Sequence, residues 1–185
     1  RDRSWYDRQA AVNSILLGCS VGVAGTVLGF IFAFAVTRLS LPKWLCAAVS
    51  AVTLLPLISP PFTSSIALTL SLGPNGILLD FFGLGNFNFY GFWGTFISET
   101  LTFFPVAFMT LSTILARIDP NLEDAAYSLG ASSFKVFRTV TLPLAAPGIA
   151  NAFLLVFSCS LADFATPQVL GGHSFPVLPT QAYPV

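Results

Sequence analysis

Few residues in this sequence could carry out catalysis or hold a metal, and they are scattered. One histidine, His173, stands in a loop-like, proline-rich tail. Three cysteines, Cys19, Cys46 and Cys159, lie far apart in apolar stretches and form no C-x-x-C pair. Nucleophilic catalysis needs a nucleophile beside a base, and a metal site needs several ligands. We therefore interpret the cysteines as small buried thiols and His173 as a surface residue, and predict neither an enzyme nor a metal site.

Two acidic residues are associated with apolar stretches. Glu99 lies within one stretch, and Asp163 follows the end of another. An acid inside a membrane marks a functional site by default, but Glu99 is only about 9 Å along a helix from Trp93 and could instead reach the interface. Asp163 either lines a pathway or marks the interface. Both are candidate pathway residues, although a proton relay would need a partner and no His, Lys or second acid lies inside these stretches.

The composition is that of a membrane protein. Of 185 residues, 55% are hydrophobic and 9% are charged, whereas a soluble domain carries about 25% charged residues. Because a helix needs about 20 apolar residues to cross the hydrocarbon, four stretches free of Lys and Arg qualify as spans: 12–37, 44–72, 93–116 and 144–162. The formal net charge is zero, which argues against a nucleic-acid partner. We predict an all-α polytopic membrane protein, a single partial domain over residues 1–185 that is open at both ends.

Basic residues predict the orientation of these spans. The turn at 38–43 and the loop at 117–143 carry Lys and Arg, whereas the loop at 73–92 and the tail after residue 162 carry none. Because positively charged loops stay on the cytoplasmic side, the first two are expected inside and the other two outside. The leading segment then lies outside although it holds three arginines, a conflict that an additional upstream span would explain.

Glycine and proline mark two of the expected spans. The first span carries Gly18-x-x-x-Gly22 and Gly25-x-x-x-Gly29, a spacing that lets helices approach closely. We interpret it as ordinary packing against a neighbouring helix rather than as a dimer seam. The second span holds three prolines in 56–61, which predict a kinked or broken helix that faces protein or a water-filled path. The 73–92 loop is either a re-entrant segment or a plain aromatic-belt loop.

The 117–143 loop is predicted to form two short helices. Asp119 suits an N-cap, Pro120 suits the first helical position, and Gly130 suits the left-handed residue that ends a helix. Acids in the early turns, Glu123 and Asp124, favour the positive end of the helix dipole. Small and apolar side chains recur on one face at Leu122, Ala125, Ala126 and Leu129.

A second short helix is expected from Ser132 or Ser133. Phe134 and Phe137 share one side of it, which would place the rings toward lipid, and Pro143 would close the loop before the next span. A loop helix with small residues on one face can enter another protein's groove. From the residues alone, that interpretation and a merely structural connector are equally good.

This loop resembles the EAA loop of ABC importer permeases, with pattern EAA-x3-G-x9-I-x-L-P. Here the pattern becomes Asp124-Ala125-Ala126, then Gly130, then a stretch ending in Leu142-Pro143. The resemblance implies a MetI-like transmembrane helix bundle, truncated before its final core helix, in a bacterial cytoplasmic membrane. It also implies that the loop docks on an ABC ATPase subunit dimer and relays its movement. Ala125, Ala126 and Gly130 would allow the close approach, and Asp124 or Glu123 would pair with a basic group of the ATPase. The further coupling residues are Leu129, Leu142 and Pro143.

Longer stretches, such as SPPFTSSIALTLSLGPNG and SLADFATPQVLGG, resemble permeases of the ferric-iron importer group. The resemblance implies a transport subunit that binds no cofactor itself, with ATP on the partner subunit. Further implied partners are an external solute-binding protein and a second permease domain, fused or separate. The solute is expected to be ferric iron, with phosphonate, thiamine or polyamine as alternatives. A secondary transporter driven by an ion gradient is the competing function, and Glu99 and the broken second span would be its basis.

Overall fold

The computed structural model describes residues 3–39, 41–58, 63, 66–67, 70, 90–171 and 175–182. The regular structure in these ranges is helical. The main helices are α1 (Arg3–Arg38), α2 (Lys43–Ile58), α5 (Phe92–Arg117), α6 (Pro120–Ser128), α7 (Ser133–Val136), α8 (Leu142–Ala162) and α9 (Leu178–Ala182), with π-helical turns η1 (Phe137–Thr141) and η2 (Pro167–Gly171). His173, the second and third prolines of 56–61, and the 73–92 loop before residue 90 lie outside the described residues.

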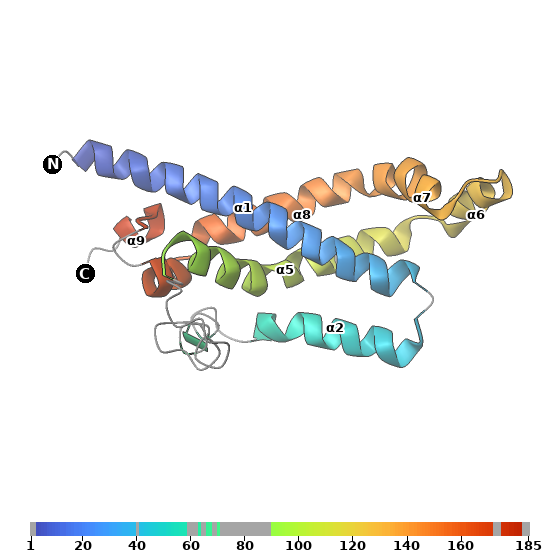
Figure 1. The fold of residues 1–185 in the computed structure, drawn as a ribbon, viewed down its shortest axis with the longest axis horizontal. Helices are drawn as coiled ribbons and strands as arrows, with labels where there is room; N and C mark the ends of the chain where they lie inside the picture. Colours follow the sequence, from blue (N-terminus) through green and yellow to red (C-terminus); the bar gives the residue numbers. More distant parts are fainter. Residues whose placement is uncertain are drawn as a thin grey trace, which may run out of the picture.

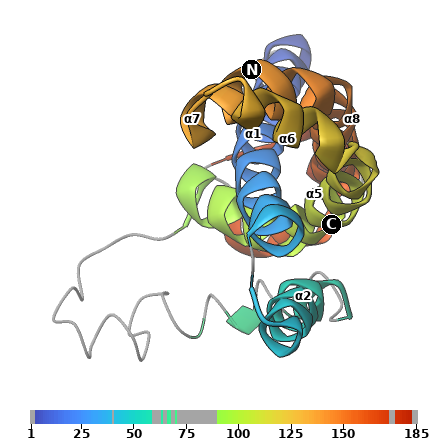
Figure 2. The same cartoon turned by 90° about the vertical axis from the view of Figure 1, so that its right-hand side faces the viewer.

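The helices α1, α5 and α8 lie alongside one another and form the bundle (Figure 1; Figure 2). Three helical segments, Asp7–Arg38, Phe92–Arg117 and Ser133–Ala162, are long and apolar enough to cross a membrane. They contain the expected spans 12–37, 93–116 and 144–162. The remaining expected span, 44–72, is described as the 16-residue α2 with Pro56 inside it, and as isolated helical residues beyond Ile58.

The glycines of α1 allow close contact within the bundle. A Cβ at Gly22 would lie 2.8 Å from the ring of Phe153 in α8, and a Cβ at Gly29 would lie 2.7 Å from the Cβ of Ala107 in α5. In lipid no hydrophobic effect drives helices together, because the lipid tails are as apolar as the side chains. Close van der Waals packing is therefore a main source of helix association. The structure thus confirms that the small residues of α1 pack against neighbouring helices of the same chain.

The two basic segments lie at the same end of the bundle. The end of α1 at Arg38, the start of α2 at Lys43 and the end of α5 at Arg117 all face the side from which α6 projects (Figure 1). The start of α1 and the short helix α9 lie toward the opposite end (Figure 1). This is the pairing of loops that the distribution of Lys and Arg predicts, with the arginine-bearing leading segment opposite the two basic loops.

The described part of the tail folds back onto the bundle, so the expectation of a loop-like tail is wrong for η2 and α9. The Gly91 N–H donates to the Leu170 carbonyl at 2.8 Å. The Asn13 side-chain amide donates to the Pro176 carbonyl at 2.9 Å, and the Leu178 N–H donates to Ser14 Oγ at 2.8 Å. Backbone groups in apolar surroundings need partners inside the protein, and these short turns supply them.

Candidate functional site

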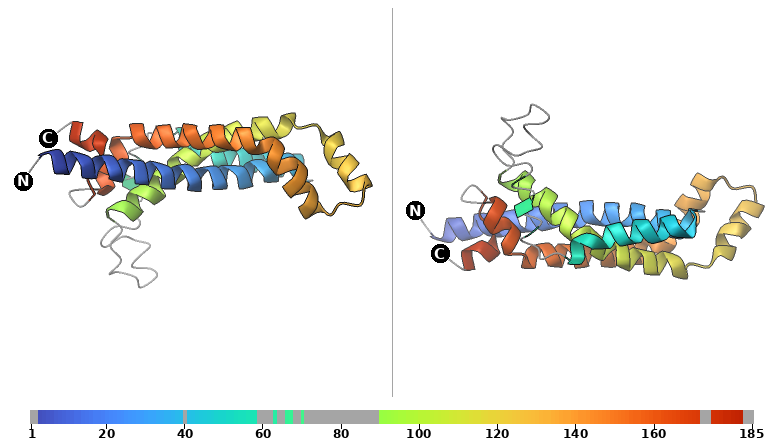
Figure 3. Two further views of the ribbon diagram at one scale, coloured as in Figure 1. Left: turned by 90° about the horizontal axis from the view of Figure 1, so that it is seen from above. Right: turned by 90° about the horizontal axis from the view of Figure 1, so that it is seen from below.

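The hairpin, residues 118–141, projects beyond the bundle between α5 and α8 (Figure 3). Its first helix, α6, begins as its sequence predicts. The Asn121 backbone N–H donates to Asp119 Oδ1 at 3.0 Å, and Pro120 takes the first helical position. The cap satisfies one of the free N–H groups at the helix start, and the proline needs no partner there.

The other end of α6 closes on Gly130. This residue has φ of 80°, in the left-handed region that side chains disfavour. Its N–H donates to the Tyr127 carbonyl at 2.9 Å, and the Ala131 N–H donates to the Ala126 carbonyl at 3.1 Å. These two bonds make a Schellman ending, as the glycine predicted. The hairpin therefore turns sharply and holds α6 as a separate, well-terminated helix.

The small and apolar face of α6 is left uncovered. Leu129 is 88% exposed and Leu122 is 49% exposed. Ala125 is also exposed, Ala126 is half-buried, and nothing lies within 4 Å of a Cβ built on Gly130. None of the residues of α6 is buried. The arrangement presents a face with little side-chain bulk at the far end of the bundle.

The two acids of α6 have different surroundings. Asp124 is exposed. The Glu123 side chain is 16% exposed, and its Oε1 lies 3.5 Å from Arg38 Nε and accepts a hydrogen bond from Thr141 Oγ1 at 2.7 Å. Glu123 is therefore engaged inside the chain. Of the two acids, Glu123 has partners within the chain, and Asp124 is exposed.

Arg38 and Thr141 are site residues that sequence reasoning missed. Arg38 also donates from Nη2 to the carbonyls of Leu115 and Ile118, at 3.1 and 3.3 Å. It counted in the sequence only as a basic residue in a turn. The signal that could have found it is an arginine at a helix end, where its fork of donors suits free carbonyls and a carboxylate together.

The second helix of the hairpin differs from the expectation. The helical segment runs from Ser133 to Ala162, and the ribbon bends near η1 rather than forming a separate loop before α8 (Figure 3). The Leu142 N–H donates to the Phe137 carbonyl five residues earlier, a π-helical bond. Pro143, near the start of α8, therefore does not close the loop as predicted, because the wider turn carries the helix into it.

The rings of this second helix do not both face lipid. Phe137 packs against Phe30 and Phe34 of α1, with ring centroids 6.2 and 5.4 Å apart, and is half-buried. Phe134 is 72% exposed. The prediction that both rings point to lipid is wrong for Phe137, because the bend at η1 turns it onto α1.

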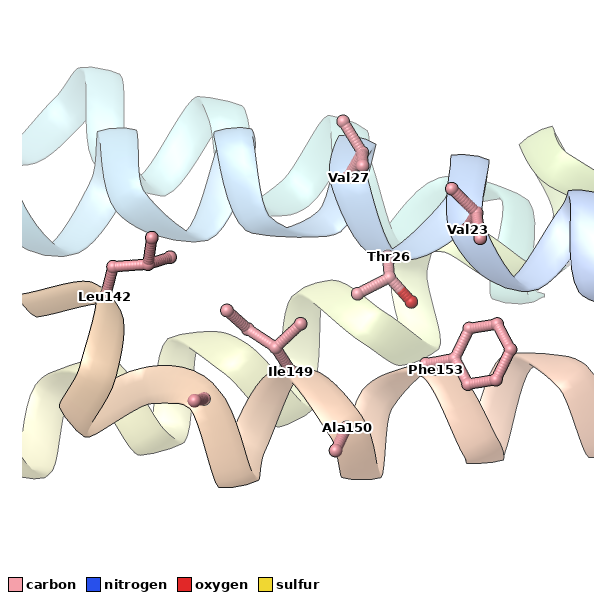
Figure 4. Close-up of a pocket in the computed structure, with 8 residues that line it drawn as sticks. Val23, Thr26, Val27, Leu142, Ile149, Ala150 and Phe153 are labelled. Carbon is pink, nitrogen blue, oxygen red and sulfur yellow. The ribbon is translucent and has the colours of Figure 1, made fainter. Parts of the chain in front are cut away.

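Leu142 and Pro143 lie at the start of α8, apart from the open face of α6. Leu142 lines a groove of about 400 Å³ between α1 and α8 (Figure 4). The lining is almost entirely apolar: Val23, Thr26, Val27, Leu142, Ala146, Ile149, Ala150 and Phe153. Apart from the Thr26 hydroxyl, such a lining offers a charged solute no polar side chain. Among the described residues, no group of three or more His, Cys, Asp or Glu could hold a metal ion.

The two candidate pathway residues lie in the interior of this chain. Glu99 of α5 is fully buried and accepts a hydrogen bond from Ser160 of α8. Asp163, 8% exposed, accepts from the N–H groups of Ala165 at 2.9 Å and Thr166 at 3.4 Å. Glu99 thus connects α5 to α8, whereas Asp163 accepts from the turn that directly follows α8. Neither is exposed on an open face of the described structure.

Comparison with known proteins identifies the family. Residues 25–184 match the family described as the binding-protein-dependent transport system inner membrane component. The chain belongs to this family. Its long apolar helices and the family description make it a multi-pass inner-membrane component. The loop that resembles the EAA motif falls within the matched residues, which supports the resemblance.

Several curated relatives cover most of this chain. It is 39% identical over 183 residues to a putative ferric transport system permease protein, FbpB 1, of Haemophilus influenzae, covering 96% of this chain and 28% of the relative. It is 40% identical to the ferric transport system permease protein FbpB of Actinobacillus pleuropneumoniae, covering 92% and 25%. Identity to the molybdenum transport system permease protein ModB of Haemophilus influenzae is 34%, covering 83% and 69%. The chain spans about a quarter of the length of the two ferric relatives.

Proposed function

We propose that this chain is part of the transmembrane permease of an ATP-driven ABC importer, and that its hairpin docks on an ATPase subunit. The observation that carries the proposal is the open face of α6, at the end of the bundle where the basic loops gather. A leucine that is 88% exposed, Leu129, beside small side chains is suited to burial in a groove of another protein. Family membership independently points to transport across the inner membrane.

Each residue of the hairpin has a distinct role in this proposal. Leu129 supplies apolar contact, and Ala125, Ala126 and Gly130 allow the ATPase to approach the α6 backbone. Asp124, which is exposed, pairs with a basic group of the ATPase. Glu123 stays within the chain. Leu142 and Pro143 mark the junction through which the hairpin continues into α8.

The chain itself is a transport subunit and not an enzyme in this account. ATP binds and is hydrolysed on a dimer of ATPase subunits, and no cofactor binds this chain directly. A solute-binding protein on the external side delivers the solute to the permease. A second permease domain, fused or separate, completes the pathway.

The proposed solute is ferric iron. Two relatives that are 39% and 40% identical over most of this chain are named as ferric transport permeases. Relatives named for molybdenum and for spermidine and putrescine transport are 34% and 27% identical. In this proposal the external binding protein, rather than the permease, chelates the iron.

Reconstitution of the full importer tests this function. The permease is purified with its ATPase, placed in proteoliposomes, and supplied with ferric iron on its own binding protein. We expect the ATPase to co-purify and iron uptake to require ATP. Uptake that survives removal of ATP and follows an imposed ion gradient would instead establish a secondary transporter. Molybdate uptake without iron uptake would support the proposed importer but contradict ferric iron as its solute.

A further inference from the structure

The contacts of Arg38 connect three parts of the molecule. Arg38 is the last residue of α1, and its Nη2 donates to the Leu115 and Ile118 carbonyls at the end of α5. Its Nε lies 3.5 Å from Oε1 of Glu123 in α6. The same Glu123 oxygen accepts a hydrogen bond from the Thr141 hydroxyl in η1 at 2.7 Å. Arg38, Glu123 and Thr141, which we call the Arg38 junction, therefore join α1, α5, α6 and η1.

This junction matters because α6 has little else to hold it. No residue of α6 is buried, so the helix has no apolar anchor in the bundle. The second part of the hairpin does have one, since Val136 is buried and Phe137 packs on two rings of α1. Arg38 and Glu123 form an ion pair, and their side chains are only 13% and 16% exposed. A partly desolvated pair attracts more strongly than an exposed one.

We propose that Arg38 is a positioning residue that makes α6 and α1 move as one body. This inference rests on the proposed function, in which an ATPase drives α6. With the junction intact, displacement of α6 is passed through Glu123 to the end of α1, and through the carbonyls of α5 to a second helix of the bundle. With the junction broken, α6 still presents its open face and binds the ATPase, but its position relative to α1 is no longer fixed.

Distance measurement in the full importer tests this mechanical role. Nitroxide labels are placed at Ile31→Cys on α1 and Ser128→Cys on α6, two exposed positions, after the three native cysteines are replaced by alanine. Distances between the labels are recorded by pulsed electron paramagnetic resonance, without nucleotide and with trapped ATP. In the otherwise unchanged protein we expect one narrow distribution with the same mean in both states. In Arg38→Gln we expect a broad distribution whose mean shifts with nucleotide.

Matched variants separate positioning from general stability. Arg117→Gln removes a basic residue that is exposed at the same end of the bundle, and it should leave the distribution narrow. Arg38→Lys keeps the charge but loses the fork of donors, and Thr141→Val removes one hydrogen bond to Glu123, so each should give intermediate broadening. If Arg38→Gln fails to insert, these two variants carry the test, with the same expected direction.

The outcomes for this inference and for the proposed function are distinguishable. A narrow, unshifted distribution in Arg38→Gln overturns the positioning role, and so does equal broadening in Arg117→Gln. Loss of the ATPase from Arg38→Gln alone also contradicts it, because the open face of α6 should still dock. If the unmodified permease binds no ATPase, the proposed function fails, while the width of the distribution without nucleotide still decides whether Arg38 holds α6.

Discussion

Two helices of this chain carry small residues at helical spacing, and they use them in opposite ways. On α1, the space beside Gly22 is filled by Phe153, and the space beside Gly29 is filled by the backbone and side chain of α5. On α6, Ala125 is exposed, and just after the helix nothing lies within 4 Å of a Cβ built on Gly130. The same type of sequence pattern therefore marks an internal seam in one place and an open surface in the other.

The difference follows from what surrounds each helix. The α1 stripe lies within a segment long and apolar enough to cross the membrane, where close backbone approach is the main way to gain contact. The small and apolar face of α6 lies in the hairpin at the end of the bundle, where Leu129 is 88% exposed within the described chain. Small residues indicate close approach, and the environment of the helix decides which partner approaches.

The largest expected effect is at the glycines of α1, where the neighbouring space is filled. In Gly29→Leu the new Cβ would lie 2.7 Å from both Ala107 Cβ and the Phe108 backbone nitrogen, so α1 and α5 must separate. Overpacking of this kind costs about 1–3 kcal/mol or more. We expect loss of folded monomer, measured by size-exclusion chromatography and thermal unfolding in detergent. Ile31→Leu, at an exposed position on α1, should behave normally. A Gly29→Leu protein that unfolds at the original temperature contradicts the close packing.

A substitution at Gly130, beside the open face of α6, should have a different effect. Gly130→Leu meets no neighbouring atom, so its cost in unfolding free energy is limited to the left-handed backbone, about 1–2 kcal/mol. We expect the protein to insert and fold but to lose the ATPase on purification and to lose solute uptake. Gly130→Asn tolerates the left-handed conformation with a smaller side chain, and it should keep more of both activities. Normal uptake by Gly130→Leu would show that this face does not dock.

A smaller effect on solute uptake is expected at the buried acid of the bundle. Glu99→Ala removes the acceptor of the Ser160 hydroxyl, and an unpaired buried polar group costs about 1–3 kcal/mol. Glu99→Gln keeps an acceptor there, so its thermal unfolding and its uptake should stay closer to those of the original protein. Abolished uptake in a well-folded Glu99→Gln would instead place Glu99 on an ion path.

The smallest effect is expected at Asp124. An exposed ion pair with the ATPase contributes less than about 1 kcal/mol, which is a few-fold in affinity. Asp124→Asn should therefore weaken ATPase binding slightly, and the difference should shrink as salt is raised, as measured by titration of the ATPase onto the reconstituted permease. Glu123→Asn serves as the comparison, and it should instead alter hairpin geometry with no such salt dependence of ATPase binding. Identical affinities for Asp124→Asn and the original protein at low salt would remove Asp124 from the interface.

Local chemistry made part of this structure predictable. Asp119, Pro120 and Gly130 act within a few residues of themselves, so the bounds of α6 followed from the sequence, as did the apolar segments that form the bundle. Contacts between distant residues did not. The pairing of Arg38 with Glu123 depends on how α1 and the hairpin are arranged. The position of Phe137 depends on the π-helical turn, which no residue pattern in the sequence predicts.

The choice between neighbouring acids shows the same limit. Glu123 and Asp124 are adjacent, and either suits the early turns of a helix. One residue along a helix changes direction by about 100°, so one side chain reaches Arg38 while the other faces outward. Only the placement of α6 against α1 decides which of the two acids reaches Arg38.

Cross-linking from the open face tests the central claim most directly. A single cysteine at Leu129→Cys, in a chain without its three native cysteines, is treated with a short bifunctional reagent in membranes that contain the whole importer. Ala162→Cys, exposed at the opposite end of α8, is the control. We expect Leu129→Cys to cross-link to the ATPase subunit and Ala162→Cys not to do so. A Leu129→Cys variant that captures no ATPase, or that reacts with a membrane-impermeant thiol reagent added from outside, would contradict the assignment of α6 as the docking helix.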